Sequence, residues 1–450
     1  MSMPSGPKSP YLVQLFQVLL DPIDSLDRLS EEYGETFRLG GDKLPPTISF
    51  STPEAIRTIF NAPSDTIGYS QKSELVKSLL GDGSFIFLPE PEHQRQRKLI
   101  VPNWHRGNLN TCGQNIIAIT QKIIGNLIPG SPFDVRQVMK RISLEVILEE
   151  VFGSDNYLIR EEIKQTLVSL FELFDSPILA SYIVTARFFP LLLEQELGLW
   201  GRVKHLQQKL DSLIYSEIVW RRERKDSHKY DLLSLLATSS DEQGQSMSDR
   251  EIRDALLTLI FAGFETAAAA MSWMLYWVHY VRERTCSHLV RDRLLNELNS
   301  GADFTEPIAI AKLPYLSAVC HETLRINPPA LSTFARTVKK PIEIDGYYLE
   351  PGTEIDVSIY LAHRRKAVYP EPNKFRPERF LERQFSTYEF LPFGGGQCRC
   401  LGASLAQYEM KLVLATIITN FELELIDPRP IKPKRHGIVV LPSGLKMKVI

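Results

Sequence analysis

Two cysteines lie two residues apart in the stretch FGGGQCRCLG, residues 393–402. Three glycines precede them, and from Leu401 to Ala415 apolar residues recur at helical spacing. A thiol that enters a helix N-terminus meets free backbone N–H groups and the positive end of the helix dipole, which together stabilise a thiolate. Glycines also let the backbone approach a flat group closely. The stretch therefore favours a thiolate that binds a metal.

Two other interpretations of these cysteines stay open on the residues alone. A structural zinc site needs four ligands, and no second cysteine pair or HxxxH pattern lies nearby. A cysteine can also be an inert core thiol, which is common for this residue type.

The stretch resembles the haem-binding loop of the cytochrome P-450 family, Phe-x-x-Gly-x-Arg/His-x-Cys-x-Gly. Aligning the phenylalanine and two glycines of that pattern with Phe393, Gly396 and Gly402 makes Cys400 the haem-iron ligand. The alternative register, with Cys398 as ligand, fails at two of its three pattern positions. The resemblance therefore implies haem b bound through Cys400.

One position departs from the family pattern. Cys398 occupies the place where the family has Arg or His beside a haem propionate, and Arg399 is one residue away. The resemblance assigns the propionates to His93 and Arg97, in HQRQR, and to Arg336. It further implies the following haem contacts: Phe393, Gly394 and Ala262. Two remaining basic residues, Arg95 and Lys98, are candidates for a patch that receives an acidic electron donor.

An ExxR pattern, Glu322-Thr-Leu-Arg325, lies on a predicted helix that ends at the Asn-Pro-Pro sequence shortly after it. The stretch FRPERF follows at residues 375–380. Alone, an i,i+3 pair is weak, because it often forms on a helix surface. The family resemblance adds Arg379 to the pair. We expect a buried network of the three that supports the cysteine loop.

The stretch AGFET, residues 262–266, matches the family's oxygen-binding motif within a long apolar helix. The resemblance implies that Thr266 and Glu265 deliver the protons for oxygen activation. An unpaired carboxylate in an apolar helix is costly, which favours a function for Glu265. The alternative is a packing glycine and a threonine bonded to its own helix backbone.

Candidate substrate-pocket residues follow from their positions in the family. Core packing is the alternative for each of them. They are Phe85, Phe87, Thr258, Ala330, Leu331, Ser332, Thr333, Ile438 and Val439.

The whole chain has 450 residues, 44 % of them hydrophobic, and a net charge of −2, which gives no electrostatic case for nucleic acid. Residues 255–281 are apolar and long enough to span a membrane, but they lie mid-chain, so we interpret them as a buried helix. We expect no transmembrane anchor and, without a secretory signal, a cytoplasmic protein.

The pattern predicts a mainly α fold with small peripheral sheets, in one domain over residues 1–450 with no fused reductase. Ser248 and Glu251 predict a capping box at the start of the long helix. Strands are expected at 46–51, at 342–359 as two strands around Glu350-Pro351-Gly352, and at 437–450 as a closing hairpin.

The resemblance implies a soluble bacterial haem-thiolate monooxygenase, closest to a cyanobacterial group related to fatty-acid hydroxylases. It would use O2 and electrons from a ferredoxin or flavodoxin with its reductase. A long-chain fatty acid or alkane is the favoured substrate, followed by a terpenoid, steroid or flavonoid. The alternatives are a haem-thiolate isomerase, a peroxygenase and a non-enzymatic haem sensor.

Overall fold

The computed structural model describes residues 3–40, 46–69, 77, 79–106, 109–153, 156–174, 198–223, 231–280, 287–436 and 439–450. The chain forms two compact units. Unit 1 contains residues 1–72, 113–143 and 263–450, and unit 2 contains residues 73–112 and 144–262. Three helices contribute residues to both units: α6 (Leu109–Gly125), α7 (Val135–Phe152) and α12 (Asp249–His279).

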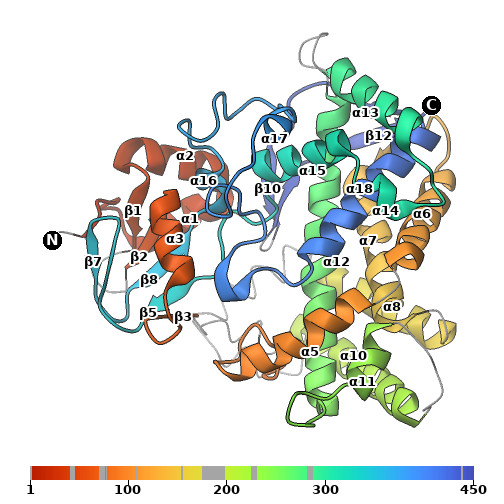
Figure 1. Ribbon diagram of the computed structural model, residues 1–450, viewed down its shortest axis with the longest axis horizontal. Helices are drawn as coiled ribbons and strands as arrows, with labels where there is room; N and C mark the ends of the chain where they lie inside the picture. Colours follow the sequence, from red (N-terminus) through yellow and green to blue (C-terminus); the bar gives the residue numbers. More distant parts are fainter. Residues whose placement is uncertain are drawn as a thin grey trace. The chain divides into compact units, whose positions relative to one another are not determined.

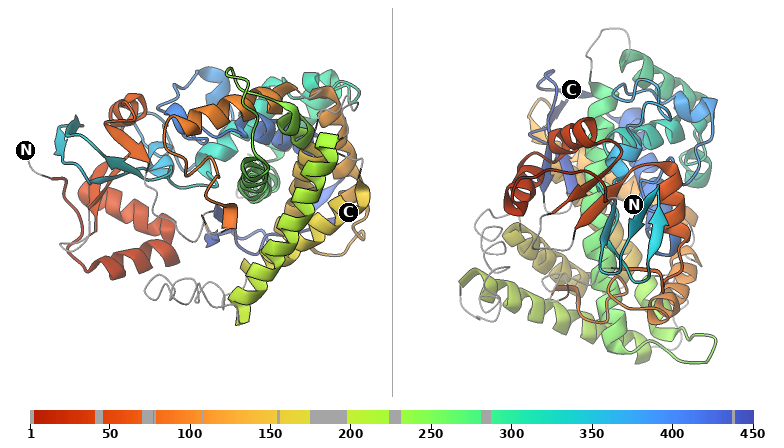
Figure 2. Two further views of the ribbon diagram at one scale, coloured as in Figure 1. Left: turned by 90° about the horizontal axis from the view of Figure 1, so that it is seen from below. Right: turned by 90° about the vertical axis from the view of Figure 1, so that its left-hand side faces the viewer.

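The largest sheet of unit 1 has five strands in the order β1-β2-β8-β5-β3. Strands from residues 36–69 and from residues 336–357 lie side by side in it, as the red-orange and cyan arrows in the right-hand view of Figure 2 show. Only β2 and β8 pair in parallel. The strands are β1 (Thr36–Leu39), β2 (Thr47–Phe50), β3 (Ile67–Tyr69), β5 (Arg336–Val338) and β8 (Glu354–Val357).

Alternation along β2 and β8 determines which side chains face the apolar core. Ile48, Phe50, Ile355 and Val357 are fully buried in a cluster that includes side chains of α3 (Pro53–Asn61). The side chain of Thr52 caps α3 by accepting from the backbone N–H of Ala55. Ser49 and Asp356 alternate with these residues and therefore occupy the opposite face of the sheet.

Three smaller sheets complete the strands of the described residues. The closing hairpin predicted at 437–450 is wrong: β11 pairs with β10, and β12 pairs with β4 and β9. The two strands predicted around Glu350-Pro351-Gly352 exist as β7 and β8 but lie in different sheets, because β7 pairs with β6. The strands are β4 (Phe133–Asp134), β6 (Ile342–Ile344), β7 (Tyr347–Leu349), β9 (Leu423–Leu425), β10 (Pro433–His436), β11 (Val439–Pro442) and β12 (Lys446–Val449).

Within unit 1, Figure 1 shows α1 to α3 near the N-terminus and α13 to α15 and α18 toward the C-terminus. Helix α15 starts at Pro314 and ends before the Asn-Pro-Pro sequence, because proline cannot continue a helix. The helices not yet given bounds are α1 (Tyr11–Leu20), α2 (Pro22–Tyr33), α13 (Ser287–Gly301), α14 (Pro307–Ile310), α15 (Pro314–Ile326), α16 (Ile359–Ala362), α17 (Arg379–Glu382) and α18 (Ala403–Asn420).

Unit 2 is built from α5 (Glu92–Arg106), α8 (Tyr157–Phe174), α10 (Gly198–Glu223) and α11 (Leu232–Thr238), with parts of the three shared helices. The predicted capping box is present at the start of α12. The backbone N–H of Ser248 donates to Glu251 Oε2 at 2.8 Å, and the backbone N–H of Glu251 donates to Ser248 Oγ at 3.3 Å. These bonds satisfy backbone donors that the first helical turn leaves open.

Among the described residues, α12 is the one helix long and apolar enough to cross a membrane. Of its most apolar window, 72 % is buried within the protein. This burial agrees with the interpretation of the apolar run as a core helix.

Candidate active site

The cysteine loop, residues 391–400, is a chain of tight turns that leads into α18. The backbone N–H of Gly394 donates to Leu391 O at 3.0 Å, and the N–H of Cys400 donates to Phe393 O at 3.0 Å. Gly394 and Gly396 adopt φ of 65° and 67°, a left-handed conformation that favours glycine. Cys400 is exposed at the end of the loop, Cys398 is half-buried, and Arg399 is exposed.

Two of the loop glycines are explained by contact with α3. A Cβ atom on Gly395 would lie 2.3 Å from the ring of Phe60, and one on Gly396 would lie 2.7 Å from the backbone oxygen of Phe60. A Cβ on Gly394 would meet only the Thr333 Cγ2 atom, at 3.8 Å. Close backbone approach to α3 therefore requires glycine at 395 and 396, while Gly394 is the position with open space.

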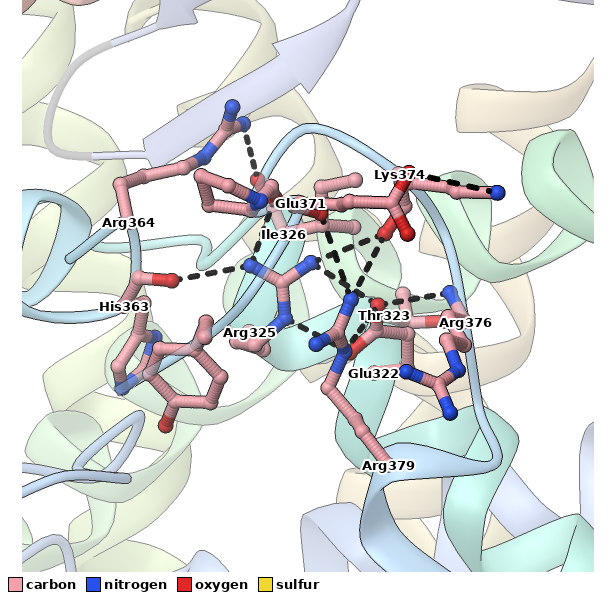
Figure 3. A network of polar contacts seen from close by, with 12 residues as sticks. Glu322, Thr323, Arg325, Ile326, His363, Arg364, Glu371, Lys374, Arg376 and Arg379 are labelled. Atoms are coloured by element: carbon pink, nitrogen blue, oxygen red, sulfur yellow. Dashed lines mark hydrogen bonds and ion pairs between the residues drawn. The ribbon is translucent and has the colours of Figure 1, made fainter. Parts of the chain in front are cut away.

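The predicted ion network of unit 1 is fully buried (Figure 3). Arg325 Nε donates to Glu322 Oε2 at 2.7 Å, and Arg379 Nε donates to Glu322 Oε1 at 3.1 Å. Other guanidinium N–H groups reach backbone carbonyls: Arg325 Nη1 donates to His363 O and Pro372 O, each at 2.9 Å. A buried charge is tolerated when it is paired and its other donors are satisfied, which is the arrangement here.

His363 connects this network to the cysteine loop, and the sequence analysis missed it. Its backbone oxygen accepts from Arg325, and its Nε2 accepts from the backbone N–H of Leu391 at 2.9 Å. Burial lowers the pKa of His363 to about 3, so the ring is neutral and Nε2 can accept. A lone histidine in AHRRK carries no signal for this role; only the fold brings it to residue 391.

On α12, Glu265 is paired with two cations from α7. Its Oε1 lies 2.8 Å from Arg136 Nη2 and its Oε2 lies 3.2 Å from Lys140 Nζ, and its side chain is 20 % exposed. Arg136 Nη2 also lies 3.3 Å from His436 Nδ1 on β10. The carboxylate is therefore compensated structurally, so its burial cost alone does not argue for catalysis.

Thr266 makes a hydrogen bond to its own helix, as the structural alternative predicted. Its Oγ1 donates to Gly263 O at 3.2 Å, and the side chain is half-buried. Such a bond orients the hydroxyl and is compatible with exchange to another acceptor.

Arg336 is buried on β5 beside the cysteine loop. Its Nη1 donates to Thr333 Oγ1 at 2.8 Å, and its guanidinium lies 5.0 Å from the centre of the Phe60 ring. Gly395 and Gly396 line the same small cleft as Arg336 and Phe60. This arginine is therefore a cation placed next to the glycine turn.

The pocket candidates of unit 1 gather around two segments. The backbone N–H of Val440 donates to Pro329 O at 2.9 Å, which brings β11 beside residues 330–333. Val439 is buried against Ala269 of α12. Ala330 and Leu331 pack at the edges of apolar clusters, and Ile438 lies outside the described residues.

The pocket candidates of unit 2 are buried to different degrees. Ser84 Oγ and Thr258 Oγ1 lie 2.7 Å apart, and Thr258 also donates to its own helix at Asp254 O. Phe85 is buried, Phe87 is half-buried and Ala262 is exposed.

The basic residues of α5 do not all match the expectation. His93 is buried and its Nδ1 lies 3.2 Å from Glu90 Oε1, while Arg97 is half-buried. Arg95 donates to Asp241 Oδ2 at 2.7 Å and to Glu251 Oε1 at 2.9 Å. These two carboxylates neutralise the charge of Arg95 within unit 2, which weakens the interpretation of Arg95 as part of a basic patch for an acidic electron donor.

Lys98 is likewise paired within unit 2, with Glu242 Oε1 at 3.3 Å from its Nζ. In the part of the chain that the structure describes, no three His, Cys, Asp or Glu side chains gather as a metal-binding group. The zinc interpretation of the two cysteines therefore has no ligand set there.

The comparisons with known proteins agree over the whole chain. The cytochrome P450 family model matches residues 3–449. The putative cytochrome P450 135B1 of Mycobacterium tuberculosis is 31 % identical over 451 residues, covering 100 % of this chain and 92 % of the relative. The putative cytochrome P450 137 of the same species is 31 % identical over 417 residues, covering 92 % of this chain and 83 % of the relative.

Two solved structures share the fold. The retinoic acid-bound cyanobacterial CYP120A1 has a TM-score of 0.81 at 23 % identity, with 100 % of both chains covered. The haem domain of cytochrome P450DA has a TM-score of 0.83 at 21 % identity, covering 100 % of this chain and 97 % of the other. The prediction of a mainly helical fold with small peripheral sheets is confirmed.

Proposed function

This chain belongs to the cytochrome P450 family of haem-dependent monooxygenases, and on that basis we propose that it hydroxylates an apolar substrate with O2 and electrons from a separate donor protein. The observation that carries the proposal is the cysteine loop. Cys400 is exposed at the end of a glycine turn that is anchored to Phe60 on one side and to His363 on the other.

The residues of the loop fit a haem group. Gly394 has open space where a side chain would lie, an exposed thiol follows, and a buried arginine lies beside the turn. Cys400 would ligate the iron, and the bound haem would supply oxygen activation, for which cysteine ligation favours O–O cleavage. The other residues proposed to hold the group are Phe393, Gly394, Arg336, His93, Arg97 and Ala262.

We assign proton transfer to Thr266 and Glu265. The Thr266 hydroxyl donates to Gly263 O at 3.2 Å, a bond within its own helix that can exchange for another acceptor. Each oxygen of Glu265 carries one ion-pair contact, to Arg136 or to Lys140, so Glu265 could take a proton on a remaining lone pair or in exchange for one of these cations. Its partial exposure favours such an exchange of partners over a fixed ion pair.

The substrate that we favour is a long-chain fatty acid or alkane, followed by a terpenoid, steroid or flavonoid. The pocket candidates of unit 1 are mainly apolar, which supports this class. One structural neighbour binds retinoic acid, an apolar acid, which keeps terpenoids among the candidates.

We further propose a ferredoxin or flavodoxin with its reductase as the electron donor, and a cytoplasmic location. The likeness to a cyanobacterial protein at 23 % identity supports a shared fold. We also propose that this chain is related to the fatty-acid hydroxylases of the family. A haem-thiolate isomerase or peroxygenase would need no donor protein, and a haem sensor would release no product.

The experiment combines the haem-loaded protein, a ferredoxin with its reductase and NADPH, and a panel of fatty acids, alkanes and terpenoids. Hydroxylated product that requires both O2 and the donor supports the proposal. Turnover with peroxide alone at the same rate, or conversion without O2 uptake, contradicts it in favour of the peroxygenase or isomerase.

Thr266→Ala is the matched variant for the proton pathway. It should bind haem and substrate but lose product formation by about 10²–10⁴-fold, with the consumed electrons appearing as peroxide. Unchanged coupling of electron consumption to product would remove Thr266 from the mechanism.

A further inference from the structure

A carboxyl group lies next to the candidate pocket segment, and nothing in the proposed chemistry uses it. Asp356 is on β8, and its Oδ2 accepts from Ser332 Oγ at 3.1 Å and from Ser49 Oγ at 3.1 Å. Ser332 is one of the pocket candidates, so the carboxyl is in direct contact with that segment. The side chain of Asp356 is half-buried.

Only one of its two oxygens is engaged. Both serines donate to Oδ2, and Oδ1 accepts no hydrogen bond from any residue that the structure describes. Asp356 is only half-buried, and its Oδ1 is not among the fully buried atoms that lack a partner in the described part of the chain. The carboxyl therefore presents one open acceptor while the serines fix its position.

Among the residues that the structure describes, no cation forms an ion pair with this carboxyl. Arg336 is the charged group that acts on it, but Arg336 pairs with Ile355 across the sheet and so lies on the face opposite to Asp356. On the face of the sheet that carries Asp356, its neighbour on β2 is Ser49, and the neighbour of Ser49 on β1 is the buried Phe37. Burial outweighs the serines and Arg336 and raises the pKa of Asp356 to about 6, so the group is ionised at neutral and higher pH.

The surroundings of the carboxyl are apolar. Phe37 belongs to a buried cluster with Tyr360 and Leu361, and Leu331, the residue before Ser332, packs against that cluster. A molecule that reaches Oδ1 from the pocket segment therefore meets one anionic acceptor beside hydrocarbon surface. That combination fits a ligand with a long apolar body and a donor group at one end.

We propose that Asp356 is a specificity-determining residue that accepts a hydrogen bond from a hydroxyl group of an otherwise apolar substrate and disfavours the corresponding carboxylate. This inference rests on the proposed function, and within its apolar substrate class it favours an alcohol over the long-chain fatty acid named there. A hydroxyl group of the substrate can donate to Oδ1. A substrate carboxylate in the same place would repel the ionised Asp356 carboxylate. Among the favoured aliphatic and terpenoid substrates, alcohols are then preferred over free acids.

The test uses matched ligands on the haem-loaded enzyme at pH 8, where Asp356 is ionised. The probes are dodecan-1-ol with dodecanoic acid, hexadecan-1-ol with hexadecanoic acid, and retinol with retinoic acid, with dodecane as the hydrocarbon. Binding is read from the ligand-induced shift of the haem spectrum. Wild-type enzyme should bind each alcohol about tenfold or more tightly than its acid, as expected for a hydrogen bond to a charged acceptor.

Asp356→Asn keeps the shape of the side chain and should reduce the preference for alcohol over acid by about tenfold. Glu354→Gln is the matched control, because it removes a carboxylate from the same face of the same strand without a hydrogen bond to Ser332; it should keep the wild-type ratio. If Asp356→Asn does not load haem, Asp356→Ser replaces it and should show the same loss of discrimination.

A wild-type preference for the acids overturns the proposal, and so does an unchanged ratio in the Asp356 variants. If acids or dodecane shift the spectrum and no alcohol does, the inference fails while the proposed function stands. If none of the probes binds, the apolar substrate class fails and the inference fails with it.

Discussion

Glu322 and Glu265 each lie between two cationic side chains of unit 1, but the two sites differ in exposure and in how completely the charges are bonded. Glu322 is fully buried; its Oε1 accepts from Arg325, Arg379 and the backbone N–H of Arg376, at 2.9, 3.1 and 2.8 Å. Glu265 is 20 % exposed.

This difference in exposure separates an ion network whose partners water cannot replace from one whose partners water and salt can replace. In the buried site each charge depends on the others, because water cannot replace a lost partner. At Glu265, water and salt can compete with the cations of α7, so partners exchange at little cost. The buried site therefore fits a structural role, and the partially exposed site is compatible with the proton transfer that we propose for Glu265.

Glu322→Gln should break the comparison most strongly. It leaves the guanidinium groups of Arg325 and Arg379 buried without a counter-charge, which costs about 3–5 kcal/mol. Since a domain is stable by about 5–15 kcal/mol, we expect a large loss of haem-loaded protein and a much lower denaturant midpoint. Glu265→Gln is the matched control and should cost about 1 kcal/mol or less. Equal losses in the two variants would mean that exposure does not distinguish the sites.

His363→Ala tests whether the buried network acts on the loop through this side chain. The variant leaves the backbone N–H of Leu391 without its acceptor, and an unsatisfied buried donor costs about 1–3 kcal/mol. We expect a lower midpoint and a larger fraction of the ferrous–CO complex without the thiolate spectrum. A normal spectrum in a protein that is merely less stable would limit His363 to packing.

Asp356 adds a third carboxylate, one that has hydroxyl donors in place of cations. Its pKa is raised from 3.8 to about 6, so folding disfavours its ionised form. The resulting cost is absent below about pH 4, develops between pH 4 and 6, and is complete above pH 6. Asp356→Asn should therefore gain up to about 3 kcal/mol in the free energy of unfolding at pH 8.

That gain should disappear near pH 4, as measured by urea unfolding of both proteins over the pH range. A gain that is the same at pH 4 and pH 8 would show that ionisation of Asp356 is not its source.

Arg136→Gln and Lys140→Gln should have the smallest effects on stability. Each removes one of two partially exposed partners of Glu265, worth about 0.2–1 kcal/mol, and salt should reduce the difference from wild type. Unfolding at low and high ionic strength provides the measurement. A salt-independent loss above about 3 kcal/mol would place Glu265 in the same class as Glu322.

The sequence predicted the elements whose signals are local. The capping box at Ser248 and the end of α15 before Pro328 follow from neighbouring residues, and the structure contains both. The strand partners did not follow, because a turn signal specifies a reversal of the chain and not which strand completes the sheet. The segment 437–450 contains such a turn, yet β11 and β12 each pair with other strands.

The candidate site shows the same limit. Family spacing led to Cys400 and to the Glu322 network, but the partners of Glu265 come from α7, whose sequence carries no sign of that contact. Asp356 reads as an ordinary polar position in the alternating strand EIDV. Its contact with Ser332 depends on a pairing of distant segments that one sequence does not reveal.

The ferrous–CO spectrum of two cysteine variants identifies the iron ligand. Cys400 is exposed where the loop enters α18, whereas Cys398 is half-buried in the preceding turn. We predict that Cys400→Ser abolishes the thiolate spectrum and that Cys398→Ser retains it. The reverse pattern, or a thiolate spectrum in both variants, would contradict the assignment of Cys400 as the iron ligand.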